Sequence, residues 1–453
     1  MWLNERISGM GNNPGAHTEE QRADAQRLTP AGRRAVFAAV LGTVIEWYDY
    51  ALYGAAAGLV IAPLFFSDAV SSAAAMMAFA TFAVGFVARP LGGVVVGHIG
   101  DKYGRRPAMM LTIILMGVAT VGVGLLPTSA AIGAAAPLLL VILRLLQGFG
   151  AGAELAGAMT LVAEFAPPKR RGFYTSLVLS TPPAGIALAT FAFFAASSLG
   201  SDVLLGWAWR VPFLVSAVLF GLALYIRNRL EETPEYTAAI EKAAAERTKA
   251  RAPLRDVLAR DWRQVLIGFF SITGHNAMNY ILAVYALSLM TSPLVGLAKS
   301  DALLAVTLGS LVSVALTPAG GWLSDRFGAP KVLLLGSVMG AALAYPIFSL
   351  LTAGSFGMAF TAIALGYGLV IPATSGAQGA FLTDLFPARR RLSGIGVARE
   401  TNGAVVAGLS PLIAAALVNA ADGGTHLAAG YLLACCLLSA IAVLLSMRVP
   451  AND

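Results

Sequence analysis

Long apolar stretches, each able to cross a lipid bilayer, dominate this 453-residue chain. A transmembrane helix needs about 20 apolar residues to cross about 30 Å of hydrocarbon. Hydrophobic residues make up 57% of the chain and charged residues 12%, whereas a soluble domain carries roughly 25% charged residues. We therefore predict an all-α membrane protein with twelve transmembrane helices. The predicted spans are 35–58, 73–97, 107–126, 135–160, 172–198, 207–228, 264–290, 301–323, 331–352, 357–380, 393–419 and 425–447.

Basic residues are concentrated in alternate connections between these spans. Lys102, Arg105 and Arg106 follow span two, residues 169–171 follow span four, and residues 389–391 follow span ten. Because basic loops stay on the cytoplasmic side, we expect a multi-pass protein of a bacterial inner membrane with both termini in the cytoplasm. The net charge of +7 is thereby assigned to membrane topology, and no nucleic-acid partner is expected.

An internal repeat divides the chain into two halves. The segment GHIGDKYG at 97–104 returns as GWLSDRFG at 321–328, and the offset of its Asp is 325 − 101 = 224. Glu164 and Asp384 begin a second match, with an offset of 384 − 164 = 220. We predict two pseudo-symmetric six-helix bundles around a central cavity. The expected boundaries are a disordered cytoplasmic leader at 1–33, bundles at 34–228 and 264–447, a cytoplasmic linker with a helix at 229–263, and a tail at 448–453.

The loop GHIGDKYGRR, residues 97–106, resembles the signature of the major facilitator superfamily. The segments VIEWYDY (44–50), FVARPLGG (86–93) and RLLQGFGAGAE (144–154) are similar to the metabolite:proton symporter family within it. The resemblance covers nearly all of 35–447 and implies the major facilitator fold and a symporter of shikimate, 2-oxoglutarate, citrate, or proline and betaine. The pair Arg399-Glu400 departs from the family pattern, so no relative's substrate can be copied.

Charged side chains inside the spans are the first candidates for function. Each costs at least about 2.5 to 3.5 kcal/mol at the bilayer centre and must face a partner or a wet cavity. Glu46, Asp49, Tyr50 and Tyr53 share one face of span one. By depth along the helices, Asp49 can meet Arg144 of span four, and we predict that they form a proton-coupling pair with Glu46 nearby. The alternative is a static ion pair between the two helices.

Further polar residues are candidates for binding a substrate. Arg89 lies at the depth of Glu154, and it either holds a substrate carboxylate or satisfies carbonyl groups freed by Pro90. Membrane asparagines often only join helices, and a lone histidine such as His275 is often structural. The predicted substrate-binding residues are Tyr50, Tyr53, Arg89, Gln147, Glu154, His275, Asn276, Asn279, Tyr280, Gln378, Arg399 and Asn402.

The three arginines Arg89, Arg144 and Arg399 favour a carboxylate-bearing small molecule, since a guanidinium binds a carboxylate through two parallel hydrogen bonds. If carboxylates of the protein neutralise them, the site suits a zwitterionic compatible solute instead. The prediction is proton symport of a small organic acid or similar polar metabolite into the cell by a monomer. The proton is the coupling ion, and we expect no cofactor and no metal.

The repeated signature loops are expected to close the cytoplasmic side. A carboxylate there can stabilise a helix N-terminus across the interface between bundles: Asp101 at span eleven and Asp325 at the other half, with Arg105 paired to Glu164. The predicted gating residues are Gly97, Asp101, Gly104, Arg105, Arg106, Glu164, Asp325 and Asp384.

Other function classes fit the sequence less well. An enzyme would need a metal cluster or a nucleophile with its base, but the chain has four histidines, two adjacent cysteines (Cys435 and Cys436) and no HExxH or GxSxG motif. A channel would need a filter loop, and the two-fold repeat has none. An exporter of small organic or drug-like compounds on the same fold remains an alternative, because sequence separates export from import poorly.

Overall fold

The computed structural model describes residues 28, 30–67, 69–103, 105–152, 154–231, 254–387 and 390–448. Every regular element in this part of the chain is helical. The first half contains α2 (Pro30–Ala56), η1 (Ala57–Ile61), α3 (Ala62–Phe65), α4 (Ser71–Tyr103), α5 (Arg105–Leu125), α6 (Ser129–Ile132), α7 (Ala135–Gly150), α8 (Glu154–Phe165), η2 (Pro168–Arg170), α9 (Arg171–Leu179), α10 (Thr181–Ser197), α11 (Ser201–Val203), η3 (Leu204–Ala208) and α12 (Arg210–Glu231).

The second half continues with the same kind of element. It contains α14 (Leu254–Arg260), α15 (Trp262–Ser271), α16 (Thr273–Tyr280), η4 (Ile281–Tyr285), α17 (Ala286–Met290), α18 (Lys299–Phe327), α19 (Ala329–Leu351), α20 (Phe356–Leu365), η5 (Gly366–Val370), α21 (Ile371–Leu385), α22 (Arg391–Asn402), η6 (Gly403–Ala407), α23 (Ser410–Ala420) and α24 (His426–Ser446).

Nine helices in the described residues are long and apolar enough to cross a membrane, and a tenth candidate is the pair Ser201–Ala208 and Arg210–Tyr225, bent by 48°. Two predicted spans differ from this pattern. Span three corresponds to the shorter apolar helix Met110–Leu125, and span seven is interrupted at Ile272 between α15 and α16. The predicted count of twelve is therefore only partly matched. The nine are Gly32–Phe65, Ser72–Val96, Ala135–Phe165, Pro168–Ser197, Lys299–Phe327, Ala329–Leu351, Phe356–Leu385, Arg391–Ala420 and His426–Ser446.

Two predicted boundaries can be compared with the helix ends. The first helix begins at Pro30, three residues before the predicted end of the leader at residue 33. Where the linker was predicted, α12 runs on to Glu231 and α14 occupies Leu254–Arg260. Asp261 lies between α14 and α15, which begins at Trp262, and residues 232–253 lie outside the described part of the chain.

The distribution of side chains differs from that of a soluble protein, because hydrophobic residues cover the surface as well as the core and some charged residues are buried. Large hydrophobic side chains cover the outer surface, among them Leu91, Val118 and Val218, whose side chains are 64% to 72% exposed. Asp49 and Arg144 are fully buried inside. An apolar exterior around an interior that holds charged residues is stable when lipid, not water, is the surrounding solvent.

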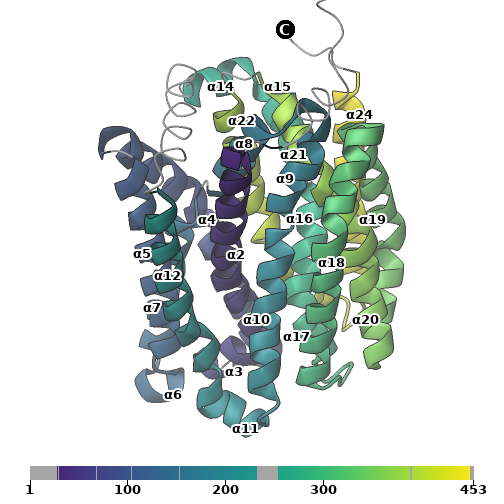
Figure 1. The fold of residues 1–453 in the computed structure, drawn as a ribbon. Coiled ribbons are helices and arrows are strands. Elements are labelled where there is room, and N and C mark those ends of the chain that lie inside the picture. The colour runs from purple at the N-terminus through teal and green to yellow at the C-terminus, as the bar shows by residue number, and fades with distance from the viewer. Residues whose placement is uncertain are drawn as a thin grey trace, which may run out of the picture.

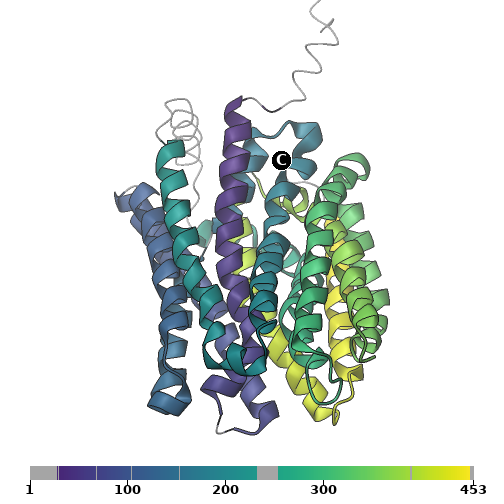
Figure 2. The same ribbon diagram turned by 60° about the horizontal axis from the view of Figure 1, so that its bottom comes forward.

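The two halves of the chain lie side by side, with α2–α12 on one side and α16–α24 on the other (Figures 1 and 2). They meet where α10 packs on α18, where α9 packs on α18 and α21, and where α4 packs on α23. Between α10 and α18 the Thr190 hydroxyl lies 2.8 Å from the Thr307 hydroxyl. Several pairs of helices, and not a single contact, therefore join the two halves.

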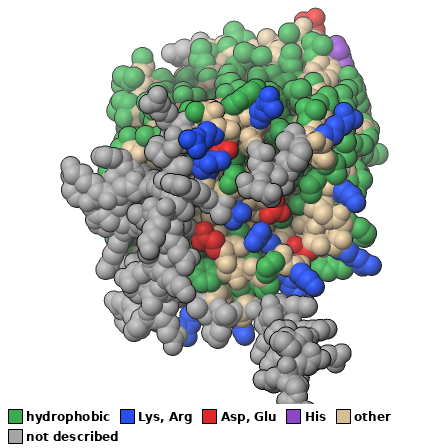
Figure 3. Space-filling model, turned by 90° about the horizontal axis from the view of Figure 1, so that it is seen from above, with side chains coloured by type: hydrophobic (Ala, Val, Ile, Leu, Met, Phe, Trp, Pro, Cys, Tyr) green, Lys and Arg blue, Asp and Glu red, His purple; other side chains and the backbone are tan. Residues whose placement is uncertain are grey.

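Charged side chains gather on the end of the molecule that carries α14. Figure 3 looks down on this end and shows basic and acidic side chains in the middle of the face, bordered by hydrophobic ones. The connections at which α9 begins and α18 ends lie here, and both belong to the predicted cytoplasmic loops.

Candidate functional site

Among the predicted site residues whose side chains are described, Asp49 is the most deeply buried carboxylate. It lies in α2 with no exposed surface, and its Oδ2 accepts a hydrogen bond of 2.9 Å from the Gln147 amide of α7. The same amide nitrogen donates to Thr120 of α5 at 2.8 Å. The other carboxylate oxygen, Oδ1, has no hydrogen-bond partner among the described residues. The side-chain hydrogen-bond partner of Asp49 is thus neutral, and Arg144 acts on the carboxylate only from a distance.

Arg144 lies one helical turn from Gln147 and is also fully buried. Its Nη1 donates to Oε1 of Gln147, its Nη2 donates to the Phe82 carbonyl at 3.3 Å, and its guanidinium carbon lies 4.1 Å from the centre of the Tyr53 ring. Within the described part of the chain, the predicted Asp49–Arg144 pair is connected through Gln147 and not by a direct ion pair. Gln147 is therefore the bridge between the carboxylate and the cation.

The predicted functional face of α2 lies next to Arg144 and Arg89. The Tyr50 ring lies between two cations, 5.1 Å from the guanidinium carbon of Arg144 and 5.2 Å from that of Arg89. The Tyr53 hydroxyl is hydrogen-bonded to Thr81 of α4. Glu46 is buried and lies within electrostatic range of Arg89. One helix thus contacts both cation sites of the first half.

Arg89 reaches across to the second half of the chain. Its Nε lies 3.1 Å from Oε2 of Glu400 in α22, and the side chains of the two are only 7% and 11% exposed. Depth along the helices suggested Glu154 as the partner, and the side chain of Glu154 lies outside the described residues. Depth fixes the height of a residue in the membrane but not the direction in which its side chain points. The carboxylate found beside Arg89 belongs to the residue next to Arg399.

Two small cavities lie between the halves. Trp47 of α2 and Tyr280 of α16 line both of them. Apart from these two, the first is lined by Tyr50, Ala51, Gly54, Phe82, Ile186, Thr190, Ala283 and Val284. The second is lined by Leu179, Pro182, Pro183, His275, Asn276, Asn279, Ile371, Ser375, Gln378 and Arg399. No aspartate or glutamate of the described chain is among these linings.

The predicted polar residues of the second half separate into two groups. Arg399 faces the second cavity and donates from Nη1 to the Gln378 carbonyl at 2.5 Å. His275 also faces it, with Nδ1 2.8 Å from the Thr374 hydroxyl. Asn402 is fully buried and donates to the Phe269 carbonyl at 2.8 Å, so it joins α22 to α15.

Asn276 and Asn279 combine both positions. Asn276 donates to Asn402 at 2.6 Å, and Asn279 accepts from the Tyr367 hydroxyl at 3.1 Å. Both also line the second cavity. Each therefore joins helices and is available to a ligand.

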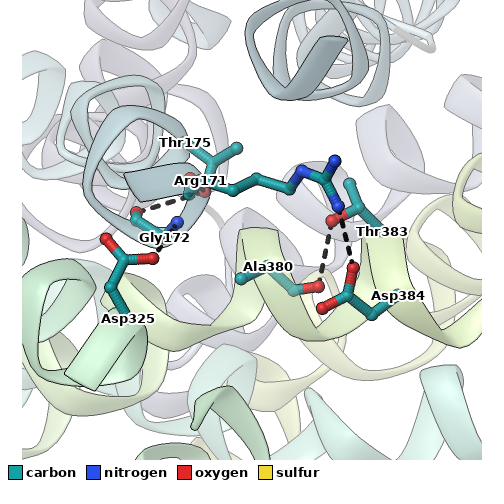
Figure 4. A network of polar contacts seen from close by, with 7 residues as sticks. All are labelled: Arg171, Gly172, Thr175, Asp325, Ala380, Thr383 and Asp384. Atoms are coloured by element: carbon teal, nitrogen blue, oxygen red, sulfur yellow. Dashed lines mark hydrogen bonds and ion pairs between the residues drawn. The ribbon is translucent and has the colours of Figure 1, made fainter. Parts of the chain in front are cut away.

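Asp325 joins the halves at the charged end of the molecule. It lies near the end of α18, and its two carboxylate oxygens accept hydrogen bonds from the backbone N–H groups of Gly172 (2.6 Å) and Phe173 (2.8 Å) at the start of α9. Beside it, Arg171 donates to Asp384 of α21 at 3.1 Å (Figure 4). A Cβ atom on Gly172 would lie 2.7 Å from Oδ1 of Asp325, so the contact requires glycine there.

The other predicted gating and binding residues are Glu164 and a group whose side chains lie outside the described residues. Glu164 is exposed at the end of α8 and takes part in a polar contact. The remaining side chains lie outside the described residues: Gly97, Asp101, Gly104, Arg105, Arg106 and Glu154.

Sequence reasoning left out Glu400, Trp47 and Arg171 as site residues. Two adjacent charges within an apolar segment, Arg399 and Glu400, were the available signal for the first of these. Trp47 lies between Glu46 and Tyr48 on a helix whose functional face was already assigned. Nothing in the sequence distinguishes it from a tryptophan that faces lipid.

Comparison with known proteins identifies the family. The domain pattern described as Major Facilitator Superfamily matches residues 39–411. The chain is 39% identical to the shikimate transporter of Escherichia coli strain K12, covering 91% of this chain and 94% of the relative. It is 34% identical to the proline/betaine transporter of the same strain (86% and 78% covered) and 34% identical to the citrate-proton symporter of Klebsiella pneumoniae (86% and 87% covered).

A solved structure supports the fold. The proton:xylose symporter XylE, bound to 6-bromo-6-deoxy-D-glucose, superimposes with a TM-score of 0.70 over 92% of this chain and 95% of the other, at 18% identity. The relatives are transporters and not enzymes, and another relative, YhjE of Escherichia coli strain K12 (35% identical, 93% and 96% covered), is an inner-membrane metabolite transport protein by name. The protein is therefore a multi-pass transporter of the bacterial inner membrane. It belongs to the major facilitator superfamily, and within it to the metabolite:proton symporter family.

Proposed function

We infer that the protein imports a small organic acid together with protons by alternating access. The observation that carries this proposal is the buried network Asp49–Gln147–Arg144, next to cavities that lie between the two halves. A network of this kind supplies a proton site inside the membrane, and the cavities supply a place for the substrate. The proton is the coupling ion, and no cofactor is required.

Asp49 is proposed as the residue that gains and loses the proton. A buried carboxylate whose direct partners are neutral amide and hydroxyl groups is costly when charged. Arg144 offsets part of that cost through Gln147. A shift of Arg144 or Gln147 during the transport cycle changes this balance, so that proton binding and release follow the movement of the helices.

An anionic substrate is supported by the second cavity. Arg399 lines it with only the neutral Gln378 as hydrogen-bond partner, and no acidic residue of the described chain is part of the lining. A guanidinium in such a position binds a carboxylate well. The apolar wall of Trp47, Pro182 and Pro183 suits the carbon skeleton of a compact metabolite.

A zwitterionic solute is the second candidate. Glu400 follows Arg399 directly and lies within electrostatic range of its guanidinium, so a ligand with both charges would find a partner for each. Export of an organic or drug-like compound is a third reading. The direction of proton-driven flux decides between it and import.

The remaining features of the proposal concern topology. We infer twelve spans in two six-helix bundles, a monomeric protein, and both termini in the cytoplasm. The charged end that carries α14 and the Asp325 contact would then face the cytoplasm, in agreement with the positive-inside rule.

The test is uptake into proteoliposomes under an imposed inward proton gradient. Labelled shikimate, 2-oxoglutarate, citrate, benzoate and betaine are compared for wild type and Asp49→Asn. The matched control is Asp202→Asn, which makes the same chemical change at an exposed residue of α11. We expect wild type and the control to accumulate an acid and to lose it on addition of a protonophore. Asp49→Asn should equilibrate the acid without accumulating it.

The possible outcomes separate the proposals. Accumulation of betaine alone would replace the organic acid by a zwitterion. Accumulation driven only by an outward proton gradient would indicate export. Normal accumulation by Asp49→Asn would show that this carboxylate is not the coupling site.

A further inference from the structure

The ion pair Arg89–Glu400 joins the two halves of the chain. Arg89 comes from α4 of the first half and Glu400 from α22 of the second, 311 residues apart, and the Nε–Oε2 distance is 3.1 Å. The guanidinium carbon is also 5.2 Å from the centre of the Tyr50 ring and 5.9 Å from that of Trp47. Both rings line the cavities, so Arg89 lies directly behind the wall of the predicted binding site.

Further charged residues surround the Arg89–Glu400 pair. Arg399 lies within electrostatic range of both Glu400 and Arg89, and its hydrogen-bond partner is the neutral Gln378. Glu46 acts on Arg89 from the other side. The phenol of Tyr280, which lines both cavities, is within range of Arg89, Arg399 and Glu400. Two arginines from opposite halves thus share one carboxylate of the second half.

We propose that Glu400 is an internal counter-ion that holds Arg89 until the carboxylate of the substrate replaces it. The inference rests on the proposed function, because it concerns how the organic acid is bound. The substrate carboxylate first meets Arg399, the cation that faces the cavity. It then takes the place of Glu400 at Arg89 and becomes the link between the two halves.

This exchange explains how a charged arginine can stay buried at every stage of a transport cycle. Removing one partner from a buried ion pair is strongly unfavourable, since it leaves an uncompensated charge. With substrate bound, the ligand neutralises Arg89. When the carrier returns without substrate, Glu400 neutralises it. Glu400 therefore competes with the substrate for Arg89 and also permits the return step.

The experiment replaces Glu400 by Gln in the full chain, reconstituted in proteoliposomes, with whichever acid of the panel above wild type transports best. Two rates are measured. One is net uptake driven by protons, which requires return of the carrier without substrate. The other is exchange of labelled for unlabelled acid at equal concentrations on both sides, which does not. Asp202→Asn again serves as the control.

For Glu400→Gln we expect the half-saturation concentration for exchange to fall about tenfold, equivalent to about 1.4 kcal/mol, because the internal competitor is lost. Exchange itself should persist, while net uptake falls at least tenfold relative to exchange. Glu400→Asp keeps the charge on a shorter side chain. It should lower the half-saturation concentration, and the ratio of net uptake to exchange, by smaller factors. An unchanged or raised half-saturation concentration would overturn the inference, as would net uptake that keeps pace with exchange.

Two measurements prevent an ambiguous result. If Glu400→Gln does not fold, as judged by its melting temperature, Glu400→Asp decides by the same criteria. Titration calorimetry of the acids on detergent-purified protein decides the matter even if wild type accumulates none of them: tighter binding by the variant supports the inference, and equal or weaker binding overturns it. Absence of proton-driven accumulation in wild type would contradict the proposed function separately, and absence of any acid binding would contradict both.

Discussion

Replacing Asp325 with alanine removes the carboxylate that joins α18 to the first turn of α9. Both of its oxygens accept backbone hydrogen bonds, at 2.6 Å from Gly172 N and 2.8 Å from Phe173 N. These N–H groups point away from α9 and have no partner within the helix. If the halves separate at this end during transport, the two hydrogen bonds break and the open conformation must do without them.

The size of the effect follows from these two bonds. A hydrogen bond to a charged group contributes about 1.5 to 3 kcal/mol, and Asp325 is only partly buried, so the lower value applies to each bond. The total of about 3 kcal/mol corresponds to a shift of roughly 100-fold toward the open conformation. Asp384 offers the comparison. Its ion pair with Arg171 is exposed, with 63% of the Asp384 side chain accessible, and such pairs contribute about 1 kcal/mol at most.

The assay measures how often this end opens. Ser375 lines the second cavity and is buried, so a cysteine placed there reacts with a reagent from this side only when α9 and α21 separate. We use Ser375→Cys with Cys435 and Cys436 changed to alanine, in inside-out vesicles with a membrane-impermeant maleimide. The labelling rate should rise roughly 100-fold in Asp325→Ala and less than about tenfold in Asp384→Ala.

The reasoning is refuted if Asp325→Ala labels no faster than Asp384→Ala while both variants retain the elution profile of wild type. Equal rates would mean that contacts other than these backbone hydrogen bonds keep this end closed.

Two further predictions concern stability. Gln147→Leu leaves Arg144 and Asp49 without their shared amide in a buried site. We expect the protein to lose about 3 to 5 kcal/mol of stability, measured as a lower melting temperature in detergent. An unchanged melting temperature would contradict the bridging role. The Asp261 side chain is 3% exposed and accepts hydrogen bonds from two nitrogens of Arg390. Asp261→Ala should therefore lower the stability by about 2 to 3 kcal/mol, which is less than for a fully buried pair because the Arg390 side chain is 22% exposed. A melting temperature equal to that of an exposed control such as Asp202→Ala would show that the pair contributes nothing.

Much of the architecture could be predicted from the sequence because it depends on local chemistry. An apolar run of sufficient length forms a helix in lipid whatever its neighbours are, since every backbone polar group must be satisfied within the segment. The predicted spans at 301–323 and 331–352 accordingly agree with α18 and α19 to within four residues at each end. The predicted helix 264–290 was less accurate, because its interruption at Ile272 carries no proline or glycine at the break itself.

The sequence by itself also singled out the charged residues to consider, since Asp49, Arg89, Arg144 and Arg399 are conspicuous in apolar segments and an unsatisfied charge there is too costly to persist. Only the tertiary structure decided their partners: Gln147 between Asp49 and Arg144, and Glu400 beside Arg89. Position along a helix gives the depth of a residue at 1.5 Å per residue. The rotation of each helix about its axis, and thus the neighbour that its side chain meets, is set by the packing of all the helices together.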